Sequence, residues 1–335
     1  MNLLPYQPGY DELSPEEQHL MPRTLKSVQK FIESSAEISK TNYATRDAHS
    51  KTYALLRGTF TKEGGLPDFV NNIFSADTQE VIVRLSHANP VVSRSKKEIP
   101  AYGFSIQFDN LKGRKANFPL VNFPIFPVKS LADFLRFFTT LNTFLYTKQD
   151  NFVVATMDVP FLVKHSGKLL PGLFSWDFVK NMQKLQSKSG DFILSFDYYS
   201  VGVFRLGNYM MKLQAVPEGK FPRYGHTLPQ DMRIKNFLES HDISYTLLAQ
   251  LCEDEKIQPV NNLGKEWKNA PTITLGRLTF TKEGWLDPTA PENEGLGFSP
   301  FENVEELQPV GRIQQSRKDI YKTSIDTRRK INGIL

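Results

Sequence analysis

Apolar and polar residues alternate with a period of two along several segments of the chain, a pattern typical of β-strands with one buried face. In the first half of the sequence it covers residues 53–61, 80–86 and 102–108. Residues 118–128 are equally apolar but include three prolines, and we expect an irregular edge strand or a crossover there. The first half therefore predicts four strands.

The same pattern returns in the second half of the sequence. Residues 198–205 and 209–216 flank a short Leu-Gly-Asn turn that indicates a hairpin, and two further strands are predicted over 243–252 and 271–281. The total is about eight strands in two groups of four. Eight antiparallel strands can close into a barrel, which removes exposed sheet edges. We predict an α+β fold, an eight-stranded antiparallel β-barrel with flanking helices.

One short sequence occurs in both groups of strands. Arg57-Gly-Thr-Phe-Thr-Lys-Glu-Gly resembles Arg277-Leu-Thr-Phe-Thr-Lys-Glu-Gly, and no fixed short period links the two copies. A solenoid or propeller is therefore disfavoured. A barrel with two similar halves fits the pattern, and chance similarity of strand composition is the alternative.

Helix signals lie before, between and after the strands. Ser14 followed by Pro15, Glu16 and Glu17 predicts a helix start, and a second helix is expected over 23–39. Further helices are predicted from Ser130, over 176–187, and at the C-terminal end of the sequence. We expect residues 1–45 to form a helical arm and 46–335 to form the barrel with the final helix.

Composition narrows the class of protein. The 335 residues are 40% hydrophobic and 12% aromatic, which predicts a globular protein. The net charge of +5 is supplied entirely by residues 309–335, with seven basic and two acidic residues, so no basic stripe indicates nucleic-acid binding. Cys252 is the only cysteine, which excludes internal disulfides and thiolate clusters.

No targeting or membrane-spanning segment is predicted. Residues 1–18 contain four acidic residues and no basic one, unlike a signal peptide. The most apolar stretches, 118–128 and 151–163, are interrupted by proline, asparagine and aspartate. We therefore expect a cytoplasmic protein. The basic final segment is compatible with contact to an anionic membrane carrying a lipid substrate, with a solvated helix face as the alternative.

The final helix carries the first candidate site. Arg317 and Tyr321 are four residues apart and share one helix face. A guanidinium beside a tyrosine favours the phenolate, which can bind ferric iron. Arg205 and Tyr209 have the same spacing, and an exposed Arg beside a half-buried Tyr is the alternative for either pair.

Two further residues are candidates for chemistry. His49 precedes a predicted strand and could act as a general base near neutral pH, or be a structural histidine. Asn122 is a polar amide within the apolar, proline-rich run, and burying it without partners would cost a few kcal/mol. It either takes part in a site or caps a turn.

Taken in order, these segments and several others resemble the haem catalases, and in particular their compact relatives, which include catalase-type allene oxide synthases. The resemblance covers roughly residues 46 to 330 and depends on the order of the whole set. The matching motifs are Arg46-x-x-His49, Arg84-Leu-Ser86, Tyr102-Gly-Phe-Ser, Asn122-Phe-Pro-Ile-Phe, Leu275-Gly-Arg-Leu, Gly297-Phe-Ser-Pro and Arg317-x-x-x-Tyr321.

The resemblance implies a catalytic set and an iron ligand. His49 matches the distal histidine that moves a proton between peroxide oxygens, Asn122 the amide that orients the peroxide, and Ser86 the serine behind the histidine. Tyr321 matches the tyrosinate ligand of the haem iron, and Arg317 the arginine that keeps it ionised.

It also implies contacts to haem b. Arg46 and Arg84 match arginines that meet the haem propionates, and Leu131 falls where many catalases place a haem-stacking Phe. Ala48 fits neither the valine of catalases nor the threonine of allene oxide synthases. In long catalases the tyrosine ligand lies four residues after the arginine of a Gly-Arg pair. Four residues after Arg312 this sequence has Ser316, whereas Tyr321 lies four residues after Arg317.

The implied function is a haem-dependent hydroperoxidase, a peroxidase or weak catalase that cleaves the O–O bond of hydrogen peroxide or organic hydroperoxides. The first alternative is an isomerase that converts a fatty-acid hydroperoxide into an allene oxide or epoxyalcohol. The second is a non-catalytic barrel that binds haem or an apolar ligand. The implied partner is a peroxide substrate, no nucleic acid is expected, and assembly into a homo-oligomer is left open.

Overall fold

The computed structural model describes residues 2–92, 100–126, 128–147, 176–188, 190–222, 228–288, 290, 293 and 295–333. The apolar stretch 151–163 lies outside these residues. Within the described part of the chain, no helix has the length and apolar character needed to cross a membrane.

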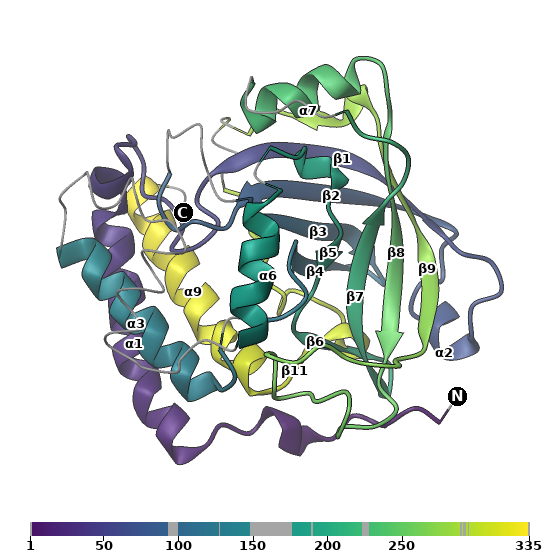
Figure 1. The fold of residues 1–335 in the computed structure, drawn as a ribbon, viewed down its shortest axis with the longest axis horizontal. Helices are drawn as coiled ribbons and strands as arrows, with labels where there is room; N and C mark the ends of the chain where they lie inside the picture. The colour runs from purple at the N-terminus through teal and green to yellow at the C-terminus, as the bar shows by residue number, and fades with distance from the viewer. Residues whose placement is uncertain are drawn as a thin grey trace.

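Eight antiparallel strands form a closed ring, which confirms the predicted barrel (Figure 1). The sheet runs from β5 through β4, β3, β2, β1, β9 and β8 to β7, which pairs again with β5. The ring strands are β1 (Thr52–Lys62), β2 (Thr78–His87), β3 (Tyr102–Leu111), β4 (Arg114–Val121), β5 (Tyr198–Tyr199), β7 (Tyr209–Pro217), β8 (Ile243–Leu251) and β9 (Thr272–Phe280). Three short strands extend it: β6 (Val203–Leu206) beside β7, β11 (Pro309–Val310) beside β6 and β10 (Trp285–Leu286) beside β1.

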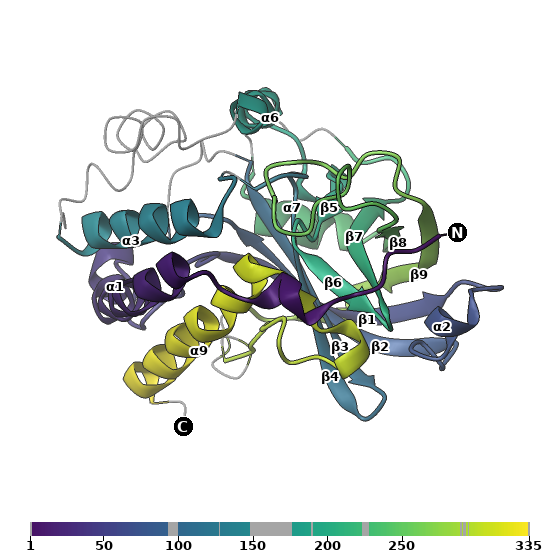
Figure 2. The ribbon, with the colours of Figure 1, turned by 90° about the horizontal axis from the view of Figure 1, so that it is seen from below.

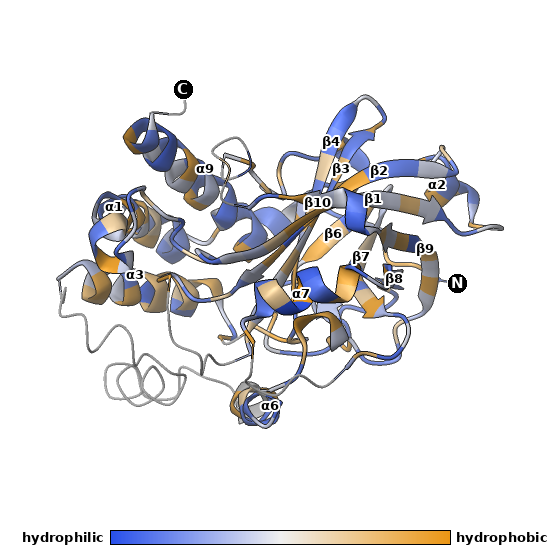
Figure 3. Cartoon of the chain, turned by 90° about the horizontal axis from the view of Figure 1, so that it is seen from above, coloured by the Kyte–Doolittle hydropathy of each residue, from blue (hydrophilic) through white to orange (hydrophobic). Residues whose placement is uncertain are grey.

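Three long helices gather on one side of the barrel: α1 (Pro15–Ser39), α3 (Leu131–Thr147) and α9 (Arg312–Asn332) (Figures 1 and 2). Their buried apolar residues form one cluster, which includes Phe31, Leu135 and Ile320. Each of these helices carries both hydrophobic and hydrophilic residues (Figure 3). The buried apolar residues pack in the cluster, as expected for amphipathic helices. The shorter helices are α2 (Asp68–Asn71), α6 (Trp176–Gln186) and α7 (Gln230–Leu238).

The N-terminal prediction of two helices is wrong, because α1 is continuous. Its start is as expected: Ser14 Oγ accepts a hydrogen bond from Glu17 N, and Ser14 N donates to Glu17 Oε2 at 2.8 Å. Pro22 lies inside the helix. The loss of one backbone hydrogen bond there is offset by burial of the apolar face against α3 and α9.

Two strand predictions also need correction. Residues 114–121 form β4, a wall strand paired with β3 along its length, where an edge or a crossover was expected. The predicted strand 198–205 is interrupted, because Val201 has a φ of 54° and separates β5 from β6. A β-branched residue rarely adopts this left-handed backbone, so periodicity gave no sign of the break.

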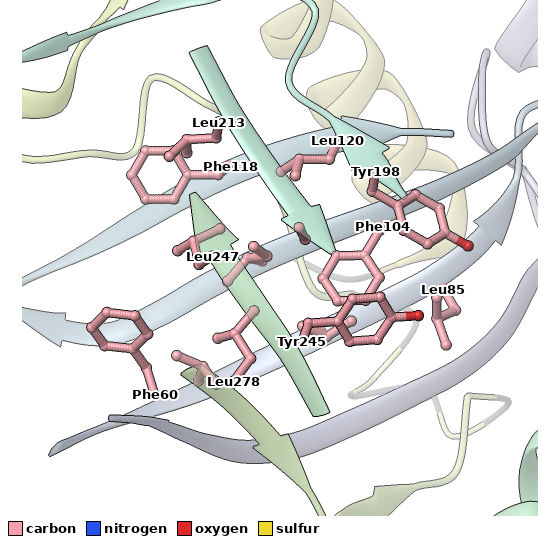
Figure 4. Packing of buried hydrophobic residues seen from close by; sticks show 14 of the residues in the cluster. Phe60, Leu85, Phe104, Phe118, Leu120, Tyr198, Leu213, Tyr245, Leu247 and Leu278 are labelled. Carbon is pink, nitrogen blue, oxygen red and sulfur yellow. The ribbon is translucent and has the colours of Figure 1, made fainter. Parts of the chain in front are cut away.

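Side chains fill the interior of the barrel (Figure 4). Phe104 packs between Tyr198 and Tyr245, with ring centroids 4.9 and 4.7 Å away. Both phenols are satisfied by a turn at Ile193–Ser195, since Tyr198 donates to Ile193 O and Tyr245 to Leu194 O. Such aromatic pairs add about 0.5–1.5 kcal/mol each beyond the area they bury. With this interior packed, the outer face of the wall is the place for a ligand.

The two copies of the repeated sequence lie side by side. β1 and β9 pair in antiparallel register, with Thr59 opposite Thr279. Each phenylalanine of the repeat covers a glycine of the other strand: a Cβ added at Gly58 would lie 2.4 Å from Phe280 Cδ1, and one at Gly276 would lie 2.7 Å from Phe60. The two glycines therefore allow two fully buried rings to pack where the halves of the barrel meet.

Replacing Gly58 tests this packing. Gly58→Ala forces a methyl group against Phe280 and the carbonyl of Thr279, and we expect it to lower the free energy of unfolding by about 1–3 kcal/mol. Urea denaturation followed by fluorescence measures the change. The matched control is Gly64→Ala, because an added Cβ there meets nothing within 4 Å. Equal stability of the two variants would contradict the close packing of Phe280 on Gly58.

Candidate functional site

A cavity of about 260 Å³ lies between the outer face of the barrel wall and the helices α3 and α9. The wall contributes side chains from β2, β3 and β4, and the loop before β1 enters from one end. Most of the residues predicted from the sequence line this cavity, namely Arg46, His49, Arg84, Arg317 and Tyr321. Residues far apart in the chain therefore meet at one site.

His49 is held by the barrel wall. Its Nδ1 lies 3.1 Å from Ser86 Oγ, and its carbonyl accepts a hydrogen bond of 2.6 Å from Arg84 Nη2. The backbone of His49 is left-handed, with a φ of 55°. Such a conformation costs free energy unless its surroundings enforce it, and it is common at functional sites. Here two contacts from β2 fix the residue.

Burial keeps the imidazole neutral. The pKa of His49 is lowered from 6.5 to about 3, first by burial and then by the positive charges of Arg84, His87, Arg317 and Arg46. A neutral imidazole that uses Nδ1 toward Ser86 can present Nε2 to the cavity. His49 is thus suited to accept a proton throughout the physiological pH range.

Gly103 makes room for this arrangement. It pairs with Ser86 across β2 and β3, and an added Cβ would lie 2.5 Å from His49 Nδ1 and 2.7 Å from Ser86 Oγ. Any side chain there would displace the histidine or the serine. The glycine belongs to the Tyr102-Gly-Phe motif, but its role depends on a cross-strand contact that the motif does not reveal.

Arg317 and Tyr321 form the pair predicted from their spacing. Arg317 Nη2 donates to Tyr321 Oη at 2.8 Å, and the guanidinium lies over the ring at 5.2 Å. A phenolate oxygen only accepts hydrogen bonds, and Arg317 supplies a charged donor to the oxygen of Tyr321. The equally spaced Arg205 and Tyr209 lie at the turn between β6 and β7, where Arg205 donates to Gly207 O.

Gln314 orients Arg317 and was not found from the sequence. Its Oε1 accepts a hydrogen bond of 2.6 Å from Arg317 Nη1, and its Nε2 donates to Val203 O on β6. Gln314 is fully buried, and an added Cβ at Gly202 would lie 2.3 Å from its Nε2. The side chain therefore ties the arginine to the barrel wall. Its place one turn before Arg317 was the available signal.

Two further residues of α9 line the cavity near the buried carboxyl group of Asp47. Ser324 and Arg328 follow Tyr321 by three and seven residues and share its face, and both line the cavity. Ser324 Oγ donates to Asp47 Oδ1 at 2.6 Å. Burial raises the pKa of Asp47, while this bond and the charges of Arg328 and Arg46 act in the opposite direction. Asp47, Ser324 and Arg328 were not predicted from the sequence, although helical spacing from Tyr321 could have found the last two.

Aromatic side chains line the cavity on the side of α3. Phe134 and Phe138 of α3 line it, with nearly parallel rings 5.3 Å apart, and Phe126 packs against Phe134 at 5.2 Å. Leu131, the residue aligned with a haem-stacking position, packs into the cluster between the helices. Aromatic side chains are thus present, one and two helical turns later than expected.

Asn122 is placed differently from the other predicted residues. Its Oδ1 accepts a hydrogen bond from Tyr102 N and its Nδ2 donates to Pro100 O, both at 2.7 Å. The side chain is 5% exposed and borders a second cavity. These contacts satisfy the buried amide without a ligand. A role in orienting peroxide stays a prediction.

The sequence matches no family model, and no curated protein matches it. Solved structures of catalases do match. A fungal catalase aligns with a TM-score of 0.62 and 16% identity over 90% of this chain and 64% of that chain. Catalase A from Saccharomyces cerevisiae aligns with a TM-score of 0.62 and 15% identity, over 91% of this chain and 66% of that chain. A bacterial catalase aligns with a TM-score of 0.60 and 16% identity, over 91% of this chain and 62% of that chain.

The chain therefore spans just under two thirds of the length of these catalases. At such low identity the likeness concerns the fold. The protein has a catalase-like fold.

Proposed function

We propose that the protein is a haem-dependent hydroperoxidase that cleaves the O–O bond of hydrogen peroxide or of organic hydroperoxides. One observation carries the proposal: the Arg317–Tyr321 pair and the neutral His49 line the same cavity. A tyrosine that can bind haem iron and an imidazole that can accept a proton are protein groups suited to heterolytic cleavage of a peroxide on haem. The catalase-like fold supports it.

The residues of the cavity fit haem b. Tyr321 would be the residue that binds the haem iron, and Arg317 donates a hydrogen bond to its oxygen. Phe134 and Phe138 offer apolar surface to a flat macrocycle. Three arginines, Arg46, Arg84 and Arg328, supply cations for two propionates. When bound, haem would supply the electrons for O–O cleavage.

His49 would perform the proton transfer. It takes the proton from one peroxide oxygen and returns it to the other, which departs as water or as an alcohol. Ser86 holds the ring through Nδ1, and Arg84 holds the backbone of the same residue. Gly103 leaves the space in which both contacts form. These three residues position the base and touch no substrate.

Two alternatives differ from this function in measurable ways. A hydroperoxide isomerase would consume no reductant and would form either an epoxyalcohol, which keeps both peroxide oxygens, or an allene oxide together with one water. A peroxidase instead releases an alcohol and consumes a reductant. A non-catalytic haem barrel would bind haem without turnover. Product analysis by mass spectrometry separates the first, and the His49 variant below separates the second.

Tyr321→Phe tests the iron ligand. The variant removes the phenolate oxygen, so the protein expressed with ample haem should bind less haem and show a shifted or lost Soret band. Absorption spectroscopy and the haem-to-protein ratio measure this. Tyr43→Phe, which changes an exposed tyrosine, is the matched control. Identical spectra for Tyr321→Phe and the parent would sink the assignment of Tyr321 as ligand.

His49→Ala tests the proton transfer. We expect peroxide turnover to fall by about 10²–10⁴-fold with the haem content unchanged. Because the pKa of His49 is about 3, the imidazole stays neutral above about pH 5. The turnover of the parent should therefore be constant from about pH 5 to about pH 8, with no inflection near 6.5. Initial rates across this range measure it. An inflection near 6.5 that disappears in the variant would show that the imidazole titrates normally and is not held neutral by burial.

A further inference from the structure

A second cavity of about 540 Å³ lies outside the barrel, between the outer face of β7, helix α6 and the segment 252–270. Figures 1 and 2 show α6 standing clear of the three long helices. Two residues, Phe123 and Val201, line both cavities. The partition between them includes the strained backbone of Val201, whose φ is 54°.

Lys212 is the unusual residue of this second cavity. Its neighbours on β7, Met211 and Leu213, belong to the interior core, so Lys212 points to the outer face. The side chain is only 5% exposed, and its Nζ has no hydrogen-bond partner among the described residues. The Nζ atom makes a cation–π contact with the ring of Trp267, whose centroid is 5.0 Å away.

Such a lysine is costly for the fold. Burying an ammonium group without a paired anion costs several kcal/mol, and the usual response is a lowered pKa. Burial lowers the pKa of Lys212 to about 8, while Cys252 and Glu266 act in the opposite direction. The ammonium group is therefore largely retained at neutral pH, and no anion among the described residues is hydrogen-bonded to it. This arrangement is suited to an anion from outside the chain.

The rest of the lining fits a carboxylate. Lys184 and Lys188 lie at the exposed mouth, and the amides of Gln214 and Gln250 flank Lys212. Of the two acidic residues, Asp197 already accepts hydrogen bonds from Tyr199 Oη and Gln214 Nε2. Glu266 is exposed. Three lysines therefore line the cavity against two acidic residues, while Phe196 and Trp267 add apolar surface for the carbon next to a carboxylate.

We propose that this second cavity binds the carboxylate of an organic acid, with Lys212 as the ion-pair partner. Because Phe123 and Val201 also line the first cavity, a hydroperoxide that carries a carboxylate can be held at its acid end while its other end reaches toward His49. This extension to the substrate rests on the proposed function. The binding site itself does not.

The test is isothermal titration calorimetry with octanoate, below its micelle concentration, on the protein purified with haem supplied. We expect one octanoate per chain for the parent, and an affinity about tenfold or more lower for Lys212→Met. Lys235→Met, which changes an exposed lysine of α7, is the matched control and should bind as the parent does. Equal affinity of Lys212→Met and the parent, or equally tight binding of 1-octanol to the parent, would overturn the proposal.

A pH titration of the parent needs no variant and guards against misfolding of Lys212→Met. Octanoate affinity should fall above about pH 8 as Lys212 loses its proton. The groups that face it are Cys252, Glu266, Asp197, Lys184 and Lys188, and burial raises the pKa of Cys252 to about 12, so the thiol stays neutral. Constant affinity from about pH 7 to about pH 9.5 would overturn the proposal.

Kinetics then separates this inference from the proposed function. A fatty-acid hydroperoxide should have a KM about tenfold or more below that of its methyl ester in the parent, and the two values should converge in Lys212→Met. Hydrogen peroxide and the methyl ester carry no carboxylate, so absent turnover of both by the parent would contradict the proposed function alone. The octanoate titration still decides whether Lys212 forms the site.

Discussion

The closed ring of strands is the constraint from which the rest of the structure follows. Closure places alternate side chains of every ring strand inside, where rings such as Phe104, Tyr198 and Tyr245 fill the space. A packed interior leaves the outer face of the wall as the surface available to ligands. Both cavities lie on that outer face, one under α3 and α9 and the other under α6. The helices therefore cover the barrel and at the same time complete its sites.

Two residues with a strained, left-handed backbone lie beside the first cavity. His49 and Val201 both have left-handed φ values, 55° and 54°, and both line the first cavity. Neither residue type adopts this conformation without cost, and the cost is offset by specific contacts such as the bond from Arg84 to the His49 carbonyl. The bonds from Arg84 and Ser86 restrict where the imidazole of His49 can move. Rigid placement of this kind is what proton transfer over a short distance requires.

Buried charge follows a different logic in the two cavities. In the first, the carboxyl group of Asp47 lies near the positive charges of Arg46 and Arg328, and Arg317 donates hydrogen bonds to Tyr321 and Gln314. In the second, the ammonium group of Lys212 has no hydrogen-bond partner among the described residues, and the ring of Trp267 lies beside it. A fold maintains a compensated charge at little cost and an uncompensated one at substantial cost. That contrast is the reason we assign a ligand to Lys212.

The sequence by itself determined most of the strands, the class of fold and the pairing of Arg317 with Tyr321 on the final helix. Period-two patterns located most wall strands to within two residues, and the spacing of Arg317 and Tyr321 was sufficient because a helix places such residues on one face. These features are local, and local patterns record them directly.

Only the tertiary structure decided the rest. The break at Val201, the wall position of β4, the space that Gly103 leaves for His49, and the link from Gln314 to Arg317 all depend on contacts between strands or between a strand and a helix. The same holds for Asn122, whose amide is satisfied by backbone twenty residues away, and for Lys212, whose isolation depends on what covers β7. A residue's partners across a sheet are set by register and closure, and no pattern within one segment of sequence specifies them.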